Sequence, residues 1–275
     1  MIRAQKIAVC AGGKTLIEDV SLDLAGGEFV AVIGPNGAGK STLLAALAGD
    51  RHPARGQVLL DGRPLPQWSR LTLARRRAVL PQSSAVAFDF TARQVAALGL
   101  LAFRGRLSER QMRDLAEQAL DETEAVAFAD QPYSVLSGGE RQRVQLARVL
   151  AQCDAQPFDG RFLLLDEPIA GLDLAHQHAA LASARRRTDR GVGVLAVLHD
   201  LNMASRYADR IGILERGELK AVGPTSATLD PDLLSAVFAT PIVRLTTDGR
   251  AVFVSPGQNI AKESPTEHKP AGFAG

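Results

Sequence analysis

The sequence predicts an α/β fold built on a parallel sheet, with antiparallel strands before it and a helical segment inserted into it. Three runs, at residues 29–33, 162–165 and 192–198, are almost entirely apolar, as strands covered on both faces are. Helical patterns lie between and after these runs, and strand–helix alternation favours a parallel sheet. From about residue 91 to residue 150 the pattern is helical throughout. This stretch is therefore predicted to be an inserted α-helical subdomain.

The N-terminal part of the chain is predicted to form short strands. Paired glycines at residues 12–13 and 26–27 are typical of turns, and apolar positions lie between them. We expect an N-terminal antiparallel β subdomain here. After the run at residues 29–33, a glycine-rich turn leads into an apolar helical stretch that should end at Gly49. A smaller strand region is expected around residues 56–62.

The inserted helices carry a start signal, and the end of the chain has a different composition. Ser108 and Gln111 have the spacing of a capping box, and apolar residues follow at helical intervals. Residues 2–245 are predicted to form one domain that includes the insertion. Residues 246–275 form a C-terminal extension. From about residue 255 it is rich in Pro, Gly, Lys and Glu, which predicts a disordered tail.

Composition argues against several classes of protein. The chain has 275 residues, 46% of them hydrophobic, and a formal net charge of +2, which gives no electrostatic reason to expect nucleic acid as a partner. Cys10 and Cys153 match no metal or disulfide spacing and are expected to be reduced thiols. The sequence has no secretory signal and no apolar run of the roughly 18 residues that a membrane span needs. We expect a soluble chain, whose membrane role would come through a partner.

A phosphate-binding loop follows the first buried strand. The pattern G-x-x-x-x-G-K-[ST] is met at every fixed position, between a strand and a helix. Glycines let backbone N–H groups converge on phosphate oxygens, and the helix N-terminus adds a favourable dipole. We expect Lys40 to reach the β- and γ-phosphates of a nucleotide, and the hydroxyl of Ser41 to bind Mg²⁺. The predicted nucleotide-binding residues are Gly34, Pro35, Asn36, Gly37, Ala38, Gly39, Lys40, Ser41 and Thr42.

Two acids end the second buried strand. Asp166 can hold Mg²⁺, directly or through water, and Glu167 is placed to polarise an attacking water as a general base. Alone, this pair could equally be exposed acids in a strand-to-loop turn. Its position after a phosphate-binding loop favours the catalytic interpretation.

A third motif narrows the class of protein. Residues 136–140 are Leu-Ser-Gly-Gly-Glu, and Arg-Gln-Arg follows. Ser137 and Glu140 have capping-box spacing, while Gly138 and Gly139 leave amides open at a helix N-terminus, which predicts a second anion site. This motif, and the order of all three motifs, resembles the ATP-binding subunits of ABC transporters. The resemblance covers nearly the whole chain without its tail.

The resemblance implies a P-loop NTPase core of the RecA-like type, with ATP and Mg²⁺ as cofactors. In ABC ATPases the second anion site faces the γ-phosphate that another subunit holds. Ser137, Gly138 and Gly139 would then bind ATP across the interface of a head-to-tail homodimer. One phosphate loop and one signature motif are present in this chain, so two copies would be needed.

Three further positions match the family, and one departs from it. Gln82 resembles the glutamine that contacts Mg²⁺ and water and senses the membrane partner, so it is both a catalytic and a metal-binding candidate. His199 resembles the switch histidine that contacts the γ-phosphate, and residues 170–173 resemble the D-loop. The aromatic residue that usually stacks on adenine is missing, since residues 10–12 are Cys-Ala-Gly. We expect weaker apolar contacts to hold the base.

Within the family, residues 77–84 with 87–91, and residues 165–168 with 172–177, are similar to haemin-import ATPases. This implies a subunit at the cytoplasmic face of the inner membrane, with permease subunits as direct partners and a periplasmic substrate-binding protein as an indirect one. An importer for a ferric siderophore or cobalamin, and a soluble ABC ATPase without a channel, stay open as alternatives. The apolar segment at residues 83–90 is expected either to dock a helix of the permease or to belong to an ordinary subdomain core.

Overall fold

The chain divides into two compact units, Met1–Thr228 and the part that begins at Leu229. The computed structural model describes residues 1–82, 89–155, 160–247 and 249–256. Most of the expected docking segment at 83–90, including Phe88, and most of the expected disordered tail therefore lie outside the described residues. Among the residues that are described, no helix is long and apolar enough to cross a bilayer.

The N-terminal strands form a four-stranded antiparallel sheet in the order β2-β1-β4-β5. Gly12 and Gly13 connect the first two strands and have φ angles of 55° and 77°. A two-residue hairpin turn with positive φ at both positions matches the twist of its strands, and glycine adopts it without strain. The strands are β1 (Ile2–Ala11), β2 (Lys14–Leu24), β4 (Arg55–Leu60) and β5 (Arg63–Pro64).

A six-stranded sheet forms the centre of the first unit, in the order β10-β9-β3-β8-β7-β6. The five strands from β9 to β6 are parallel, and β10 pairs with β9 in the antiparallel direction. Every residue of β3, β7 and β8 is buried, which explains their continuous apolar runs. The strands are β3 (Phe29–Ile33), β6 (Arg77–Leu80), β7 (Phe162–Asp166), β8 (Gly193–Val197), β9 (Arg210–Glu215) and β10 (Glu218–Pro224).

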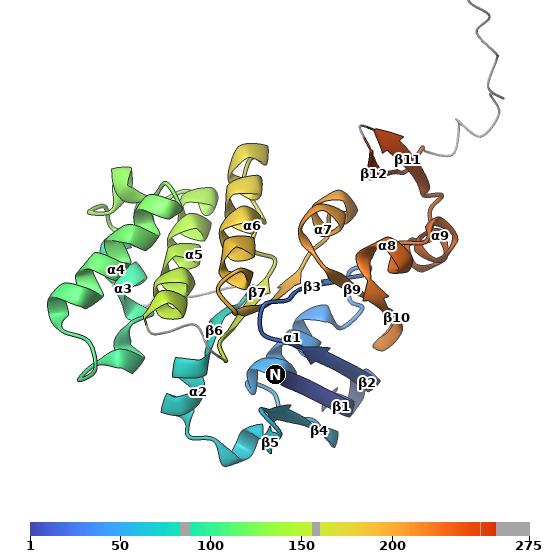
Figure 1. Cartoon of the computed structure of the whole chain (residues 1–275), viewed down its shortest axis with the longest axis horizontal. Coiled ribbons are helices and arrows are strands. Elements are labelled where there is room, and N and C mark those ends of the chain that lie inside the picture. The colour runs from blue at the N-terminus through green and yellow to red at the C-terminus, as the bar shows by residue number, and fades with distance from the viewer. Residues whose placement is uncertain (83–88, 156–159, 248, 257–275) are drawn as a thin grey trace, which may run out of the picture. The chain divides into compact units, whose positions relative to one another are not determined.

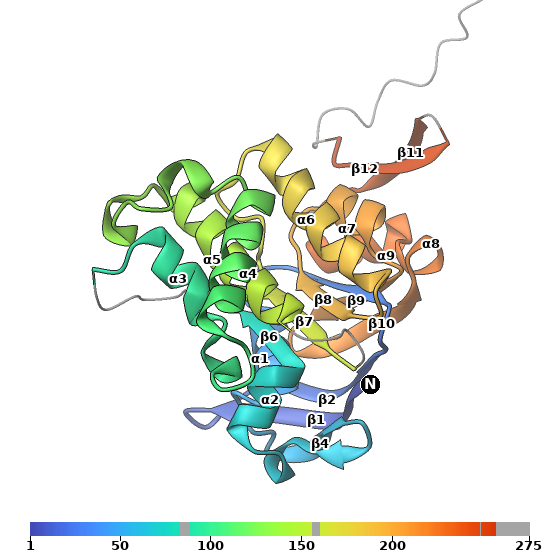
Figure 2. The same cartoon turned by 60° about the vertical axis from the view of Figure 1, so that its left-hand side comes forward.

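Helices connect these strands, and three of them pack together as the predicted insertion. Figures 1 and 2 both show α3, α4 and α5 gathered into one group beside α6. The helices of the first unit are α1 (Lys40–Ala48), α2 (Arg70–Arg76), α3 (Ala92–Leu98), α4 (Glu109–Glu122), α5 (Gly138–Asp154), α6 (Leu174–Thr188), α7 (Leu201–Tyr207) and α8 (Thr225–Thr228). Short 3₁₀ turns are η1 (Leu65–Gln67), η2 (Leu101–Phe103), η3 (Val126–Phe128) and η4 (Tyr133–Val135).

The second unit contains α9 (Pro231–Phe238) and a hairpin of β11 (Val243–Thr247) with β12 (Arg250–Val254). The helix begins where Asp230 accepts a hydrogen bond from the N–H of Leu233, at 2.9 Å. The hairpin crosses the expected boundary between residues 245 and 246, and that boundary stays a prediction.

The predicted fold class is confirmed. The central sheet is parallel apart from one edge strand, the N-terminal sheet is antiparallel, and the helical subdomain is inserted between β6 and β7. The expected helix end at Gly49 is also present, because this residue has φ 77° and its N–H returns to the carbonyls of Ala45 and Ala46.

Candidate nucleotide-binding site

A cavity of about 560 Å³ lies where β3 and β7 end and the chain turns into loops. The carboxyl ends of parallel strands meet at one edge of a sheet, which is where open α/β proteins bind ligands. Ten of its eleven lining residues were predicted from sequence, in the glycine-rich loop, α1 and three later positions. The lining residues are Leu16, Asn36, Gly37, Ala38, Gly39, Lys40, Ser41, Thr42, Gln82, Glu167 and His199.

The glycine-rich loop leaves backbone donors free to face a ligand. α1 begins at Lys40, and its N-cap residue Gly39 has φ 102° and no side chain to cap the helix. The first N–H groups of an α-helix have no partner within the helix, and they attract anions. At Gly34, where φ is 150°, an added Cβ would lie 2.0 Å from the carbonyl oxygen of Leu214. Only glycine lets the loop follow this path beside β9.

Lys40 places a positive charge inside this loop. Its Nζ donates to the carbonyl oxygens of Gly34 at 2.8 Å and Pro35 at 2.9 Å, and the residue is only 6% exposed. Burial lowers the pKa of Lys40, while the nearby charges of Glu167 and Asp166 oppose that shift. A buried cation whose hydrogen bonds among the described residues go to carbonyl oxygens suits a phosphate group, which would accept a charged hydrogen bond from it.

Ser41 and Asp166 form a pair of oxygen ligands beside the loop. The Ser41 hydroxyl donates to Oδ1 of Asp166 at 3.1 Å, and Asp166 is 4% exposed. Burial raises the pKa of Asp166, and the hydrogen bond from Ser41 works against that rise. A hydroxyl and a carboxylate are the hard oxygen donors that Mg²⁺ prefers, so these residues fit that ion.

Two of the predicted residues, His199 and Gln82, contact the same carboxylate oxygen of Glu167. Its Oε1 lies 2.7 Å from Nε2 of His199 and accepts a hydrogen bond from Nε2 of Gln82 at 3.2 Å. The backbone of Glu167 has φ 52°, in the left-handed region that ordinary residues adopt at a cost of about 1 kcal/mol or more. Its N–H is held by the carbonyl oxygen of Val197 at 3.2 Å, so the core sheet supports this conformation.

The signature residues are not brought to this cavity. Ser137 caps α5, and its N–H donates to Oε2 of Glu140 at 2.8 Å, as the predicted capping box requires. Ser137, Gly138 and Gly139 are absent from the cavity lining, in the part of the chain that the structure describes. An added Cβ at Gly139 would lie 3.0 Å from the carbonyl oxygen of Gly171, so the signature packs beside the predicted D-loop.

Two residues near the site were not predicted. Leu16, at the start of β2, lines the cavity and is the large apolar side chain beside the loop. Gln142, one turn into the signature helix, donates from Nε2 to the backbone oxygen of Glu167 at 3.1 Å. Neither residue type carries a functional signal in sequence, since both are ordinary in strands and helices.

Comparison with known proteins decides the family. The model of the family described as ABC transporter matches residues 17–170, which is more than half of the chain. The chain belongs to the ABC transporter family. As an ABC ATP-binding protein it binds ATP and hydrolyses it, and the combination of its phosphate loop with Glu167 agrees with that activity.

Curated relatives of this ABC protein match it over most of their length. It is 49% identical to a hemin import ATP-binding protein of Rhodococcus jostii, over 88% of this chain and 80% of the relative. It is 43% identical to a hemin import ATP-binding protein of Gloeobacter violaceus, over 95% of this chain and 99% of the relative. Among solved structures, a dimeric bacterial ABC transporter cassette matches with 28% identity and a TM-score of 0.72, over 82% of this chain and 99% of that one.

Proposed function

We propose that this ABC ATPase energises the import of haemin, as two copies attached to a membrane permease at the cytoplasmic face of the inner membrane. ATP hydrolysis is supported above all by one observation: the same cavity is lined by Lys40, Ser41, Glu167 and His199. The haemin half is supported by relatives named hemin import ATP-binding proteins, which are 43% to 49% identical over most of this chain.

In this proposal the glycine-rich loop and α1 hold the triphosphate. Backbone N–H groups at the start of α1 and the Nζ of Lys40 bind the β- and γ-phosphate oxygens. Ser41 and Asp166 hold Mg²⁺, which when bound would neutralise charge that develops on the phosphate oxygens. The apolar face of Leu16 lies against the nucleoside end, in place of the aromatic residue that family members usually have.

Glu167 is proposed as the general base. Its contacts with His199 and Gln82 both use Oε1, so among the described residues Oε2 is left to accept a hydrogen bond from water. The carboxylate orients that water toward the γ-phosphorus and takes its proton, while His199 contacts the γ-phosphate itself. Gln82 reaches both Glu167 and the Mg²⁺ side of the cavity, which would let a partner that moves residue 82 control hydrolysis.

The second half of each ATP site would come from another copy of the chain. Ser137, Gly138 and Gly139 lie at a capped helix N-terminus outside the cavity of their own chain. A head-to-tail homodimer would bring them to the γ-phosphate held by the partner copy. A solved relative that is dimeric supports the pairing of two copies.

Transport into liposomes tests the proposal. The chain, reconstituted with its co-purified permease and supplied with haemin and the periplasmic binding protein, should accumulate haemin only when ATP is present. The Glu167→Gln chain in the same membranes should not. ATP hydrolysis that never moves haemin would contradict the cargo, and the same liposomes would then be given ferric siderophores and cobalamin. An ATPase that never co-purifies with a permease would contradict the import role.

An apolar groove on the helical subdomain is the proposed permease-docking surface. It has a volume of about 390 Å³ and lies between α3, η2 and α4. Leu101 on its wall is 47% exposed, which is high for a large apolar residue. Positive charges rim the groove, and the residues that line it are Phe90, Arg93, Gln94, Ala97, Leu98, Leu101, Arg104, Glu109, Met112, Arg113 and Ala116.

Replacing Leu101 by Asp should uncouple transport from hydrolysis. A carboxylate in the groove would have to lose its water when an apolar helix docks, which costs several-fold to hundred-fold in affinity. We expect haemin uptake to fall by about tenfold or more, with the hydrolysis rate of the isolated chain unchanged. Leu71→Asp, at another exposed leucine (50% exposed), is the matched control. Equal losses of uptake in the two variants would contradict this docking surface.

A further inference from the structure

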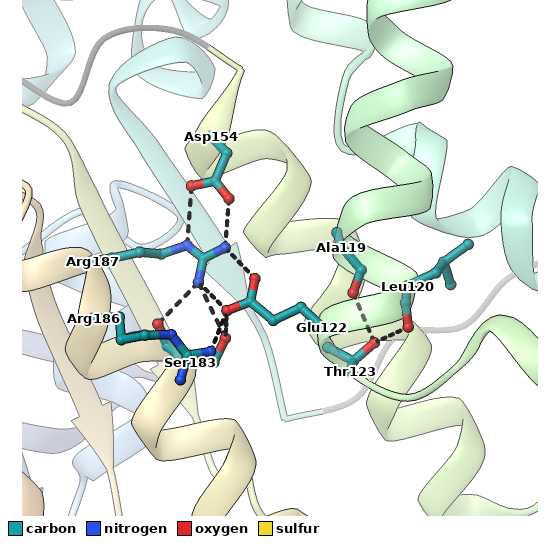
Figure 3. Close-up of polar contacts among 8 residues, drawn as sticks. All are labelled: Ala119, Leu120, Glu122, Thr123, Asp154, Ser183, Arg186 and Arg187. Carbon is teal, nitrogen blue, oxygen red and sulfur yellow. Dashed lines mark hydrogen bonds and ion pairs between the residues drawn. The ribbon is translucent and has the colours of Figure 1, made fainter.

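A cluster of charges around the buried Arg187 joins α4, α5 and α6 at the C-terminal end of α5, the helix that begins with the signature motif (Figure 3). Arg187 of α6 is 3% exposed and contacts two carboxylates. Its Nε and Nη2 lie 3.1 Å and 2.5 Å from the two oxygens of Asp154. Its Nη1 and Nη2 donate to the two oxygens of Glu122 at 3.1 Å and 2.8 Å. The fork of one guanidinium thus grips both acids with two hydrogen bonds each.

Both acids lie at the C-terminal end of a helix, a position that is electrostatically unfavourable for a carboxylate. Glu122 is the last residue of α4, and Asp154 is the last residue of α5. The C-terminal end of a helix carries partial negative charge, so a carboxylate there is locally unfavourable. Both acids are unfavourable in their own helices, so the contacts with Arg187 indicate that tertiary interactions outweigh the local cost at this place.

The charged groups around the buried Arg187 all have hydrogen-bond partners. Burial would raise the pKa of Glu122, yet the bonds and charge of Arg187, with further bonds from Ser183 and Arg186, lower that pKa to about 2. Burial works to lower the pKa of Arg187, while Glu122 and Asp154 raise it. The hydroxyl of Thr123 closes the last turn of α4 through the carbonyls of Ala119 and Leu120, as Figure 3 shows. Glu122 and Arg187 therefore remain ionised in the fold.

The helices α5 and α6 run side by side in the same direction and are joined at both ends. Toward the N-terminal ends of the two helices, Nη1 of Arg143 on α5 lies 3.2 Å from Nε2 of His176 on α6. Gln142 of α5 also donates to the backbone oxygen of Glu167, in the loop before α6. At the far end Arg187 binds Asp154. Arg143 lies three turns before Asp154 on α5, so these joints are separated by about 17 Å. Two joints this far apart fix the direction in which the helix points.

We propose that Arg187 is a positioning residue. It fixes the position of α5, which begins with the signature motif, relative to α6, which follows the predicted D-loop. By holding the C-terminal end of α5, it fixes where Ser137, Gly138 and Gly139 stand when they meet the ATP of the other copy. The inference rests on the proposed head-to-tail dimer. The contacts of Arg187 with described residues are to Glu122, Asp154 and Ser183 and include no predicted nucleotide-binding residue, so Arg187 would act through the helix that it anchors.

A purely structural ion pair makes a different prediction. If the cluster only stabilised the fold, weakening it would lower ATP binding to the phosphate loop and ATP-driven dimer formation in the same proportion. A positioning role leaves the phosphate loop of the single chain intact and weakens only the step that uses the signature motif. ATP affinity of the monomer and affinity of the ATP-bound dimer therefore separate the two roles.

The test uses Asp154→Asn in the Glu167→Gln chain, in which bound ATP should be hydrolysed on the order of 10²–10⁴-fold more slowly. The amide keeps the shape of the side chain and leaves Arg187 its second partner, Glu122, so the fold should survive. We expect monomer ATP affinity to change by less than about twofold and dimer affinity to weaken about tenfold, the scale of other coupling effects. Arg185→Gln is the matched control, because Arg185 lies on the same helix as Arg187. The substitution breaks a 2.5 Å ion pair with Asp209, which is not part of α5.

The possible results separate this inference from the proposed function. A control that dimerises normally beside a weakened Asp154→Asn chain supports the positioning role. Equal dimer affinity in Asp154→Asn and its parent, or equal losses of monomer and dimer affinity, would overturn it. If the parent Glu167→Gln chain itself stays monomeric with ATP, the proposed dimer fails, and this inference fails with it.

Discussion

Replacing Glu167 by Gln is expected to lower the rate of ATP hydrolysis by on the order of 10²–10⁴-fold, the usual contribution of a general base. Glutamine keeps the size of the side chain and can still meet His199 and Gln82, so the geometry of the cavity should be kept. What it loses is the ability to take a proton from water. Steady-state phosphate release measures the rate, and equilibrium titration measures ATP binding.

The expected signature of this variant is a loss of kcat with ATP affinity unchanged within about twofold, since the interaction is made only in the transition state. Glu218→Gln is a suitable control, because Glu218 is an exposed acid that pairs with Lys220 on β10. A Glu167→Gln chain that keeps its hydrolysis rate within tenfold of the parent would show that another group takes the proton.

Replacing Lys40 by Ala should instead abolish most ATP binding. The side chain is buried in the glycine-rich loop, where it would supply a charged hydrogen bond to phosphate. Losing such a bond in a protected site is worth about 3 kcal/mol, which lowers ATP affinity on the order of 100-fold. Titration with ATP at constant ionic strength checks the change.

The same substitution should cost the fold little. Burial lowers the pKa of Lys40, which means that the folded chain holds this charge at a cost. Removing it relieves that cost and leaves two carbonyl groups, of Gly34 and Pro35, to be satisfied by water. Lys14→Ala, at an exposed lysine that begins β2, serves as the control. Wild-type ATP affinity in the Lys40→Ala chain would remove this residue from the site.

The parts of the fold that sequence could predict are those with a local pattern. β3, β7 and β8 are buried on every residue and show as apolar runs, and the capping box at Ser108 and Gln111 is present in the structure. β6 was not predicted, because it has four residues and only Ala78 and Leu80 are buried. β9 and β10 were missed as well. They form a pair at the sheet edge, and β10 has no buried residue to mark it.

The residues of the candidate site also divide into those that a local sequence pattern reveals and those that it does not. The phosphate loop, Asp166 and Glu167 could be found because their spacing along the chain is itself the signal. Leu16 could not, because its place in the cavity depends on how β2 packs against the loop. The cluster around Arg187 joins residues that lie 65 and 33 positions away in the chain. No local pattern links them, so only the packed structure reveals the contact.

If two copies of the chain share each ATP, the ATP-bound Glu167→Gln chain should have the mass of a dimer. Light scattering after size-exclusion chromatography, with the bound nucleotide counted, should find a dimer that holds two ATP molecules and falls apart when ATP is removed. Adding Ser137→Arg should leave each chain able to bind ATP but monomeric, since the larger charged side chain blocks the second anion site. A monomer with ATP bound in the Glu167→Gln chain, or a dimer that persists after Ser137→Arg, would show that two copies do not share ATP through the signature motif.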